Sequence, residues 1–210
     1  MSAARTNILK KIKQALVHKV PVPFSANQAT INSVFQPSQQ ELEVEFAANF
    51  SGLQGRFSYC ADQSELVTQL KILFETRGWK NIYCREDNIK SNLAKQGFSI
   101  TYFDDLAHCD AAITGCEYLV ARTGSLLLSS AQQSGRTVSV YAPVHICIAS
   151  TKQLVYDIDD SLMQLRDKYS SNFPSMVSLA SGPSRTADIE KTLVVGVHGP
   201  KEVFCFLIDE

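Results

Sequence analysis

The sequence predicts an α/β protein with three layers, in which a mostly parallel sheet lies between helices. Between residues 57 and 103, short apolar runs of strand length alternate with segments whose apolar residues recur at helical spacing. The joints are short, and strand–helix–strand alternation of this kind produces a parallel sheet with helices on its faces. Further short apolar runs between residues 118 and 208 predict additional strands.

The elements of the first half follow from apolar spacing and from the residues that begin and end helices. Asp62 offers a helix start, and Gly78 tolerates the left-handed geometry that closes a helix. The predicted elements are a helix at 41–50, a strand at 57–60, a helix at 64–76, a strand at 81–84, a helix at 87–96 and strands at 98–103 and 111–114.

The second half changes to short strands with turn residues between them, interrupted by one amphipathic helix. The predicted strands are 118–121, 126–129, 138–142, 144–149, 176–180, 193–197 and 203–208, and the predicted helix is 158–169.

The N-terminal residues 1–40 are predicted to form an arm outside a single α/β domain at 41–210. This arm carries Arg and Lys but no Asp or Glu, and apolar residues between Ile8 and Leu16 recur on one helical face. An amphipathic helix is therefore expected, followed by a polar connection. An acid-free basic start is also typical of a mitochondrial transit peptide, which stays an alternative.

Composition excludes several classes of protein. The chain has 210 residues, of which 45% are hydrophobic and 20% charged, as in ordinary soluble domains and unlike disordered chains. The net charge of −1 gives no general attraction for nucleic acid. No apolar run approaches the roughly 18 residues of a membrane span, so no span is expected.

The cysteines argue against a metal or cluster in this chain. There are six, with no C-x-x-C pair, and the two nearest are Cys109 and Cys116. Iron–sulfur clusters and structural zinc need close-spaced thiolates, so no cofactor and no metal are expected here. Most of the cysteines lie in apolar runs and are predicted to be buried, which favours a reducing compartment, the cytoplasm.

The strongest local motif runs from Ser181 to Glu190. A strand ends, Gly182 and Pro183 make a turn, and a helix is predicted to open near Ser184. A helix start attracts anions through its free N–H groups, and Ser184, Arg185 and Thr186 would add donors for a carboxylate or phosphate. The alternative is a plain helix cap at Ser184.

Two further segments could contribute to such a site. In Thr123-Gly124-Ser125, between two apolar runs, a glycine would let backbone N–H groups approach a ligand closely, although a tight turn explains it equally well. His198, in Gly196-Val197-His198-Gly199-Pro200, follows a strand, and because an imidazole can give, take or share a lone pair and a proton it is a candidate acid, base or ligand. A structural or solvated histidine is the alternative.

His145 and Glu117 are weaker candidates. His145 alternates with Val144 and Ile146 and should face the other side of their strand, either in a pocket or as a satisfied core histidine. Glu117 lies near the Thr123 segment in sequence and is a candidate base, against the default of a surface carboxylate.

The segments 181–190 and 196–200 together closely resemble the C-terminal signature of the LUD-domain family, the lactate-utilisation proteins of the LutC (YkgG) type. The stretch from Thr123 to Leu128 and the stretch from Pro143 to His145 resemble the middle motifs of that family. The resemblance covers about residues 55–209. Relatives tend to carry an acidic residue before the Thr-Gly pair, where this chain has Arg122.

The resemblance implies a fold like that of the NagB/RpiA/CoA-transferase group. It also implies participation in the oxidation of L-lactate to pyruvate, alongside two partner proteins that carry iron–sulfur clusters. The expected pocket then lies between Thr123–Ser125, Ser184–Thr186 and His198, with Arg185 pairing with a carboxylate and His198 accepting a proton. Two alternatives stay open: a stand-alone enzyme acting on a phosphorylated, CoA-linked or folate-like small molecule, and a non-catalytic scaffold subunit.

Overall fold

The computed structural model describes residues 3–17, 37–38, 40–186 and 194–210. The chain divides into two units, residues 1–37 and residues 38–210. In the first unit, α1 (Ala3–Val17) is the amphipathic helix predicted from the sequence. Most of the predicted polar connection lies outside the described residues. None of the described helices is long and apolar enough to cross a bilayer.

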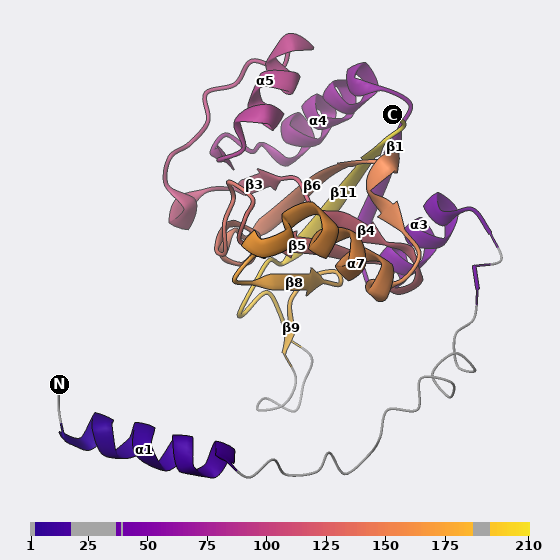
Figure 1. Cartoon of the computed structure of the whole chain (residues 1–210). Helices are drawn as coiled ribbons and strands as arrows, with labels where there is room; N and C mark the ends of the chain where they lie inside the picture. Colours follow the sequence, from indigo (N-terminus) through magenta and orange to yellow (C-terminus); the bar gives the residue numbers. More distant parts are fainter. Residues whose placement is uncertain (1–2, 18–36, 39, 187–193) are drawn as a thin grey trace. The chain divides into compact units, whose positions relative to one another are not determined.

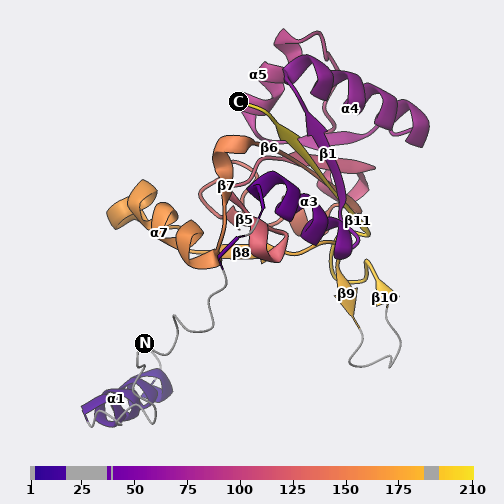
Figure 2. The same ribbon diagram turned by 90° about the vertical axis from the view of Figure 1, so that its right-hand side faces the viewer.

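The second unit contains both helices and strands (Figures 1 and 2). Its helices are α3 (Leu42–Gly52), α4 (Gln63–Arg77), α5 (Asp87–Lys95), α6 (Val138–Tyr141) and α7 (Ile158–Tyr169). Its strands are β1 (Arg56–Cys60), β2 (Ile82–Cys84), β3 (Ala111–Thr114), β4 (Tyr118–Val120), β5 (Ser125–Ser129), β6 (Val144–Ser150), β7 (Leu154–Val155), β8 (Val177–Ala180), β9 (Arg185–Thr186), β10 (Val194–Val195) and β11 (Glu202–Ile208).

The main sheet confirms the α/β prediction. It has five strands in the order β1-β11-β6-β3-β2, and every neighbouring pair is parallel. The C-terminal strand β11 therefore lies inside the sheet, between β6 and β1. Asp62 caps α4 by accepting from the Glu65 N–H, and Gly78 closes the same helix in the left-handed conformation, as the sequence predicts.

Alternate side chains of the sheet enter two different cores. On one face, Val144 and Ile146 of β6 pack with Leu66 and Leu70 of α4. On the other face, a second core joins residues of β6 and β11 to α3 and to β4 and β5: Phe46, Phe50, Leu119, Leu126, Cys147, Ala149, Cys205 and Leu207. The layers are thus α4 and α5, the parallel sheet, and a third layer made of α3 and a second sheet (Figure 2).

The second sheet is built from the short strands of the second half, in the order β7-β4-β5-β8. The β4–β5 and β5–β8 pairs are antiparallel, whereas β4 and β7 are parallel. One of its faces packs on the main sheet through Leu119, Leu126 and Leu128. The short strands thus form a separate layer instead of extending the parallel sheet.

Three predicted elements are wrong. Residues 98–103 form no strand, because Phe98 packs against Phe74 of α4, with ring centroids 5.6 Å apart, and only the Phe103 N–H bonds to β2. Residues 138–142 contain the helix α6. Its first residue, Val138, and the residue after its end, Ala142, are four positions apart and are buried in the same cluster, as the spacing of a helical turn allows.

The predicted helix near Ser184 is also wrong, because β9 begins at Arg185 and pairs antiparallel with β10. Ser184 donates its N–H to Pro200 O at 2.9 Å and accepts from the Gly196 N–H at 3.0 Å. These hydrogen bonds hold residues 185–186 in an extended conformation, as part of the two-stranded β9–β10 sheet. Residues 187–193, the rest of the expected helix, lie outside the described residues.

All six cysteines are free and buried. Burial raises the pKa of the Cys60, Cys84 and Cys109 thiols to about 11. A protonated, inaccessible thiol is a poor nucleophile.

We therefore expect no thiol to react rapidly with an aromatic disulfide reagent at neutral pH while the chain is folded. All six should react after unfolding in guanidinium, because the thiols are then solvated. Absorbance of the released thiolate measures both. Rapid modification of even one thiol in the native protein would contradict the buried arrangement.

Candidate functional site

The two glycine-containing motifs meet at the C-terminal end of α3. The Ser125 and Ser181 hydroxyls are hydrogen-bonded at 2.6 Å, which joins the start of β5 to the segment after β8. Asn49 of α3 donates its side-chain N–H to Ala121 O at 2.9 Å, just before the Thr123 motif. The structure thus brings Thr123–Ser125 and Ser181–Gly182 together around the end of a helix.

Both glycines are required by close backbone packing. Gly124 has φ +56°, and a Cβ there would lie 2.6 Å from the backbone carbonyl carbon of Asn49. Gly182 has φ +77°, and a Cβ there would meet Leu53 O at 2.5 Å. The left-handed conformation and the lack of space both favour glycine. At these two glycines the backbone lies directly against α3 and the residue that follows it.

Two polar side chains of the Ser181 motif, Ser181 and Arg185, are likewise hydrogen-bonded within the protein. The Arg185 guanidinium donates to Leu53 O, at the C-terminal end of α3, where a cation also complements the helix dipole. Thr186 lies in β9 opposite Val194. The Thr123 hydroxyl is buried and makes no hydrogen bond within the described part of the chain. Arg122 pairs with Asp157 at 2.7 Å.

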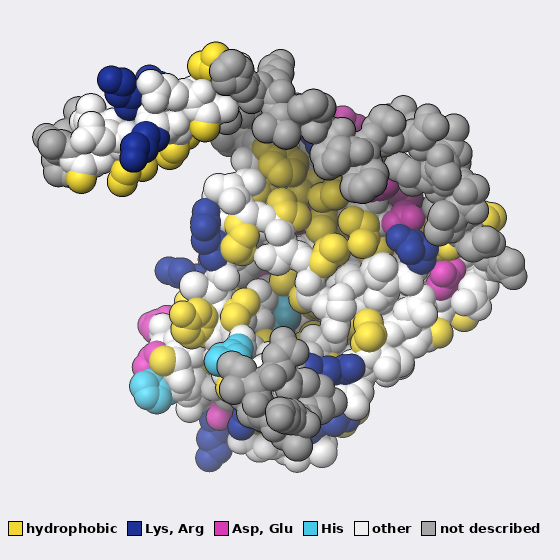
Figure 3. Space-filling view, turned by 90° about the horizontal axis from the view of Figure 1, so that it is seen from below, with side chains coloured by type: hydrophobic (Ala, Val, Ile, Leu, Met, Phe, Trp, Pro, Cys, Tyr) yellow, Lys and Arg dark blue, Asp and Glu magenta, His cyan; other side chains and the backbone are white. Residues whose placement is uncertain are grey.

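His198 lies in a groove at the amino ends of β6 and β11. The groove has a volume of about 420 Å³ and is lined by Val140, Tyr141, Pro143, Gly196, Val197, His198, Gly199 and Lys201. The Lys201 N–H donates to Pro143 O at 2.8 Å, which fixes the turn against the start of β6. In Figure 3, histidine, basic and hydrophobic side chains share the face of this unit from which β9 projects in Figure 1.

The groove gathers three groups that can bind an anion. His198 is exposed, Tyr141 is 70% exposed, and Lys201 is the next residue after the Gly199-Pro200 turn. An ammonium, a phenol and an imidazole are all donors to a carboxylate or phosphate. Sequence reasoning found His198 but missed Lys201 and Tyr141. Lys201 could have been found, because it directly follows the turn that contains His198. Tyr141 was missed because residues 138–142 were predicted to be a strand, whereas Tyr141 ends the helix α6.

His145 is a fully buried histidine, on the face of β6 opposite Val144 and Ile146. The Thr114 hydroxyl donates to Gly115 O at 2.8 Å, so its oxygen must accept from His145 Nε2, 2.7 Å away. This assigns the proton to Nε2 and leaves Nδ1 as a buried acceptor without a hydrogen bond among the described residues. Burial lowers the pKa of His145 to about 4.

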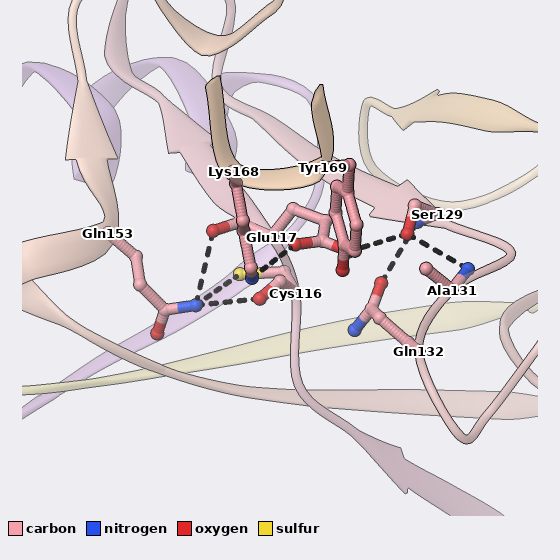
Figure 4. A network of polar contacts seen from close by, with 8 residues as sticks. All are labelled: Cys116, Glu117, Ser129, Ala131, Gln132, Gln153, Lys168 and Tyr169. Carbon is pink, nitrogen blue, oxygen red and sulfur yellow. Dashed lines mark hydrogen bonds and ion pairs between the residues drawn. The ribbon is translucent and has the colours of Figure 1, made fainter. Parts of the chain in front are cut away.

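Glu117 occupies a different region, between the second sheet and α7 (Figure 4). The residue is 3% exposed, and its carboxylate accepts from the Ser129 hydroxyl at 2.5 Å, the Tyr169 hydroxyl at 2.9 Å and Lys168 Nζ at 2.8 Å. Both carboxylate oxygens therefore have protein partners. Glu117 follows β3, at the opposite end of the parallel strands from His198. The structure does not bring these two candidate catalytic residues together.

The Glu117 network has a clear structural effect. Lys168 and Tyr169 end α7, while Ser129 ends β5, so one buried carboxylate holds the helix on the second sheet. Burial lowers the pKa of Lys168, but the hydrogen bond and negative charge of Glu117 outweigh it, and the net pKa is raised. No group of three or more His, Cys, Asp or Glu side chains in the described part of the chain could hold a metal ion.

Replacing Gly124 tests the close packing against α3. Gly135 also has positive φ, at +66°, but a Cβ there would meet no neighbouring atom within 4 Å. Gly135→Ala should lose about 1–2 kcal/mol of unfolding free energy from the backbone conformation alone. Gly124→Ala should lose about 1–3 kcal/mol more because of overlap with α3. Urea unfolding of both variants measures the difference, and equal losses would disprove the contact.

The neutral state of His145 predicts a pH dependence of stability. Its pKa is about 4 when folded and should be near 6.5 when unfolded, so the unfolded chain binds the proton more tightly. The contribution is present above pH 6.5 and is lost as the pH falls towards 4, by up to about 3 kcal/mol. Urea unfolding between these pH values should show a steeper decline for the wild type than for His145→Gln. Parallel curves would contradict a buried neutral imidazole.

Comparisons with known proteins agree with the sequence resemblance. An uncharacterized protein of Neisseria meningitidis serogroup B is 27% identical over 220 residues, covering 98% of this chain and 94% of that protein. Lactate utilization protein C of Halalkalibacterium halodurans is 38% identical over 103 residues, and that of Oceanobacillus iheyensis is 32% identical over 102 residues. Each of these two matches covers 48% of this chain and 44% of the relative.

The fold is also shared with a solved structure. The crystal structure of a DUF162 family protein from Deinococcus radiodurans superposes with a TM-score of 0.61, covering 82% of this chain and 99% of that one, at 17% identity. The family model of the LUD domain matches residues 85–208, more than half of the sequence, and includes the Thr123, His145 and His198 motifs. The chain therefore belongs to the LUD domain family.

Proposed function

We propose that this chain is a component of an L-lactate utilisation system, in which L-lactate is oxidised to pyruvate together with iron–sulfur partner proteins in the cytoplasm. The likeness to proteins named Lactate utilization protein C supports the substrate. The observation that carries the site is the groove that places Tyr141, His198 and Lys201 around one space of about 420 Å³. In this proposal that groove binds a small carboxylate.

The roles of the groove residues follow from their chemistry. Lys201 supplies the positive charge for the carboxylate, and the Tyr141 hydroxyl donates a hydrogen bond that orients it. His198 accepts the proton of the substrate hydroxyl, since a neutral imidazole is a base near neutral pH. The oxidation also breaks the bond between C2 of lactate and its hydrogen, which releases two electrons and a second proton. In this proposal the electrons would pass to the iron–sulfur partner proteins and the proton to solvent. Arg185, which the sequence placed on the carboxylate, instead supports the loop by bonding to Leu53 O.

Lactate-dependent dye reduction tests both the system and the site. Extracts of a strain lacking this chain should lose the activity and regain it with the wild-type protein. Lys201→Gln and His198→Ala should each restore at most about a tenth of the rate, because a charge-assisted contact or a general base is lost. Lys152→Gln, an exposed lysine after β6, is the matched control and should restore the full rate.

The contrary results separate the alternatives. Activity that never depended on the chain would remove the lactate proposal and favour a stand-alone enzyme on a phosphorylated or CoA-linked substrate. Activity that depends on the chain but is fully restored by both groove variants would remove the site and favour a scaffold subunit. Circular dichroism of each variant establishes that it is folded.

A further inference from the structure

A second groove lies at the other end of the parallel sheet, where β2 ends. It has a volume of about 600 Å³, and its wall includes Tyr83, Arg85, Lys90, Phe103, Asp104 and Gln133. None of these residues lines the His198 groove, which lies at the amino ends of β6 and β11. The two spaces are therefore distinct.

The topology makes this position suitable for a ligand. β2 and β3 are neighbours, but the chain leaves them towards opposite faces of the sheet. After β2 it enters α5, whose Leu93 packs with α4, and after β3 it enters the second sheet. Chains that diverge in this way leave a crevice at the carboxyl ends of the strands, where open α/β sheets bind ligands.

The crevice between the two strands is crossed by one hydrogen bond. The Gly115 N–H, just after β3, donates to Glu86 Oε1, just after β2, at 3.1 Å. The groove lies beyond that bond. Its wall includes Tyr83 and Arg85, which flank Cys84 in the sequence, and Gln133 from the loop after β5. Gln133 is held in place because its side-chain oxygen accepts the Asp87 N–H at 2.8 Å.

Two groups on the wall have unused hydrogen-bonding capacity. Tyr83 is only 7% exposed, and within the described part of the chain its hydroxyl makes no hydrogen bond. Arg85 is exposed and, among the described residues, has no ion-pair partner. Among the described residues, the fully buried polar atoms without a partner belong to Tyr102, Thr123 and His145. The Tyr83 hydroxyl therefore keeps contact with solvent and can donate a hydrogen bond to a ligand in the groove.

Lys90 adds a second cation beside them. Its ammonium is 2.6 Å from Asp87 Oδ1, which uses one of its three protons and keeps the side chain at the groove. Gln133 also donates to the other Asp87 oxygen, at 3.2 Å, so Asp87 is fully engaged with the wall. Arg85, Lys90 and Tyr83 together present more donors than the two oxygens of one carboxylate require.

We propose that this groove binds the phosphate group of a small hydroxylated phosphate monoester. The three terminal oxygens of a phosphate match the donors of Tyr83, Arg85 and Lys90 better than a carboxylate does. Asp104, the carboxylate on the wall, repels a bare anion but accepts a hydrogen bond from a ligand hydroxyl. Phe103 supplies an apolar face for the carbon skeleton. The site is independent of the proposed lactate chemistry.

Calorimetric titration of the full chain tests this, with inorganic phosphate, glycerol phosphate and acetate as probes at equal ionic strength. Both phosphates should bind saturably, the monoester more tightly. Acetate, a small carboxylate that the His198 groove is proposed to accept, should not displace either phosphate. Arg85→Gln should weaken phosphate binding by roughly ten- to a hundredfold, the factor expected for a lost hydrogen bond to a charged group. Tyr83→Phe, which removes only one oxygen atom, should weaken it by a smaller factor.

Matched variants separate the site from general charge effects. Arg166→Gln removes an exposed arginine of α7, so this variant should bind phosphate like the wild type. Asp104→Asn should reduce the preference for glycerol phosphate over inorganic phosphate. Absence of saturable phosphate binding, or equal losses in Arg85→Gln and Arg166→Gln, would overturn the proposal. Because no lactate assay is involved, its failure is distinguishable from failure of the proposed function.

Discussion

The insertion of the C-terminal strand into the middle of the sheet is the constraint on which the rest of the structure depends. All seven residues of β11 pair with β6, and five of them also pair with β1. Its side chains alternate between the two cores, with Phe204 and Phe206 towards the helices and Cys205 and Leu207 towards α3. Neither core is closed until this last strand is in place, so the long-range pairing dominates the fold.

The same insertion positions both grooves. Because β11 runs beside β6, the turn before it is tied to Pro143 and faces α6, which creates the His198 groove. The order of the remaining strands leaves β2 at the edge, with its carboxyl end open beside the loop after β5. One end of the sheet thus presents His198 and Lys201, and the other presents Arg85 and Lys90.

The motifs that carry the family resemblance have a role in packing. Gly124 and Gly182 allow the backbone to lie against α3, and Arg185 bonds to the end of that helix. The Ser125–Ser181 hydrogen bond joins the two motifs directly. Residues that a sequence comparison singles out can therefore be fixed by the docking of α3, while the groups that face open space, Lys201 and Tyr141, stand just outside the recognised patterns.

The sequence by itself determined the fold class, the helices α4, α5 and α7, and the burial of the cysteines, because these follow from local spacing and capping. Asp62 and Gly78, for example, act within a few residues of their own positions. The sequence also singled out the two glycine motifs and the His198 turn as candidate functional segments.

Tertiary structure decided what those motifs contact. The ribbon at Ser184 forms because Pro200 and Gly196, distant in sequence, provide its hydrogen bonds, and residues 98–103 are held out of the sheet by Phe74. Glu117 and His198 are separated because they lie at opposite ends of parallel strands. Tyr83, Arg85 and Gln133 meet only because β2 becomes the edge strand. Such contacts depend on strand order, which no local pattern in the chain encodes.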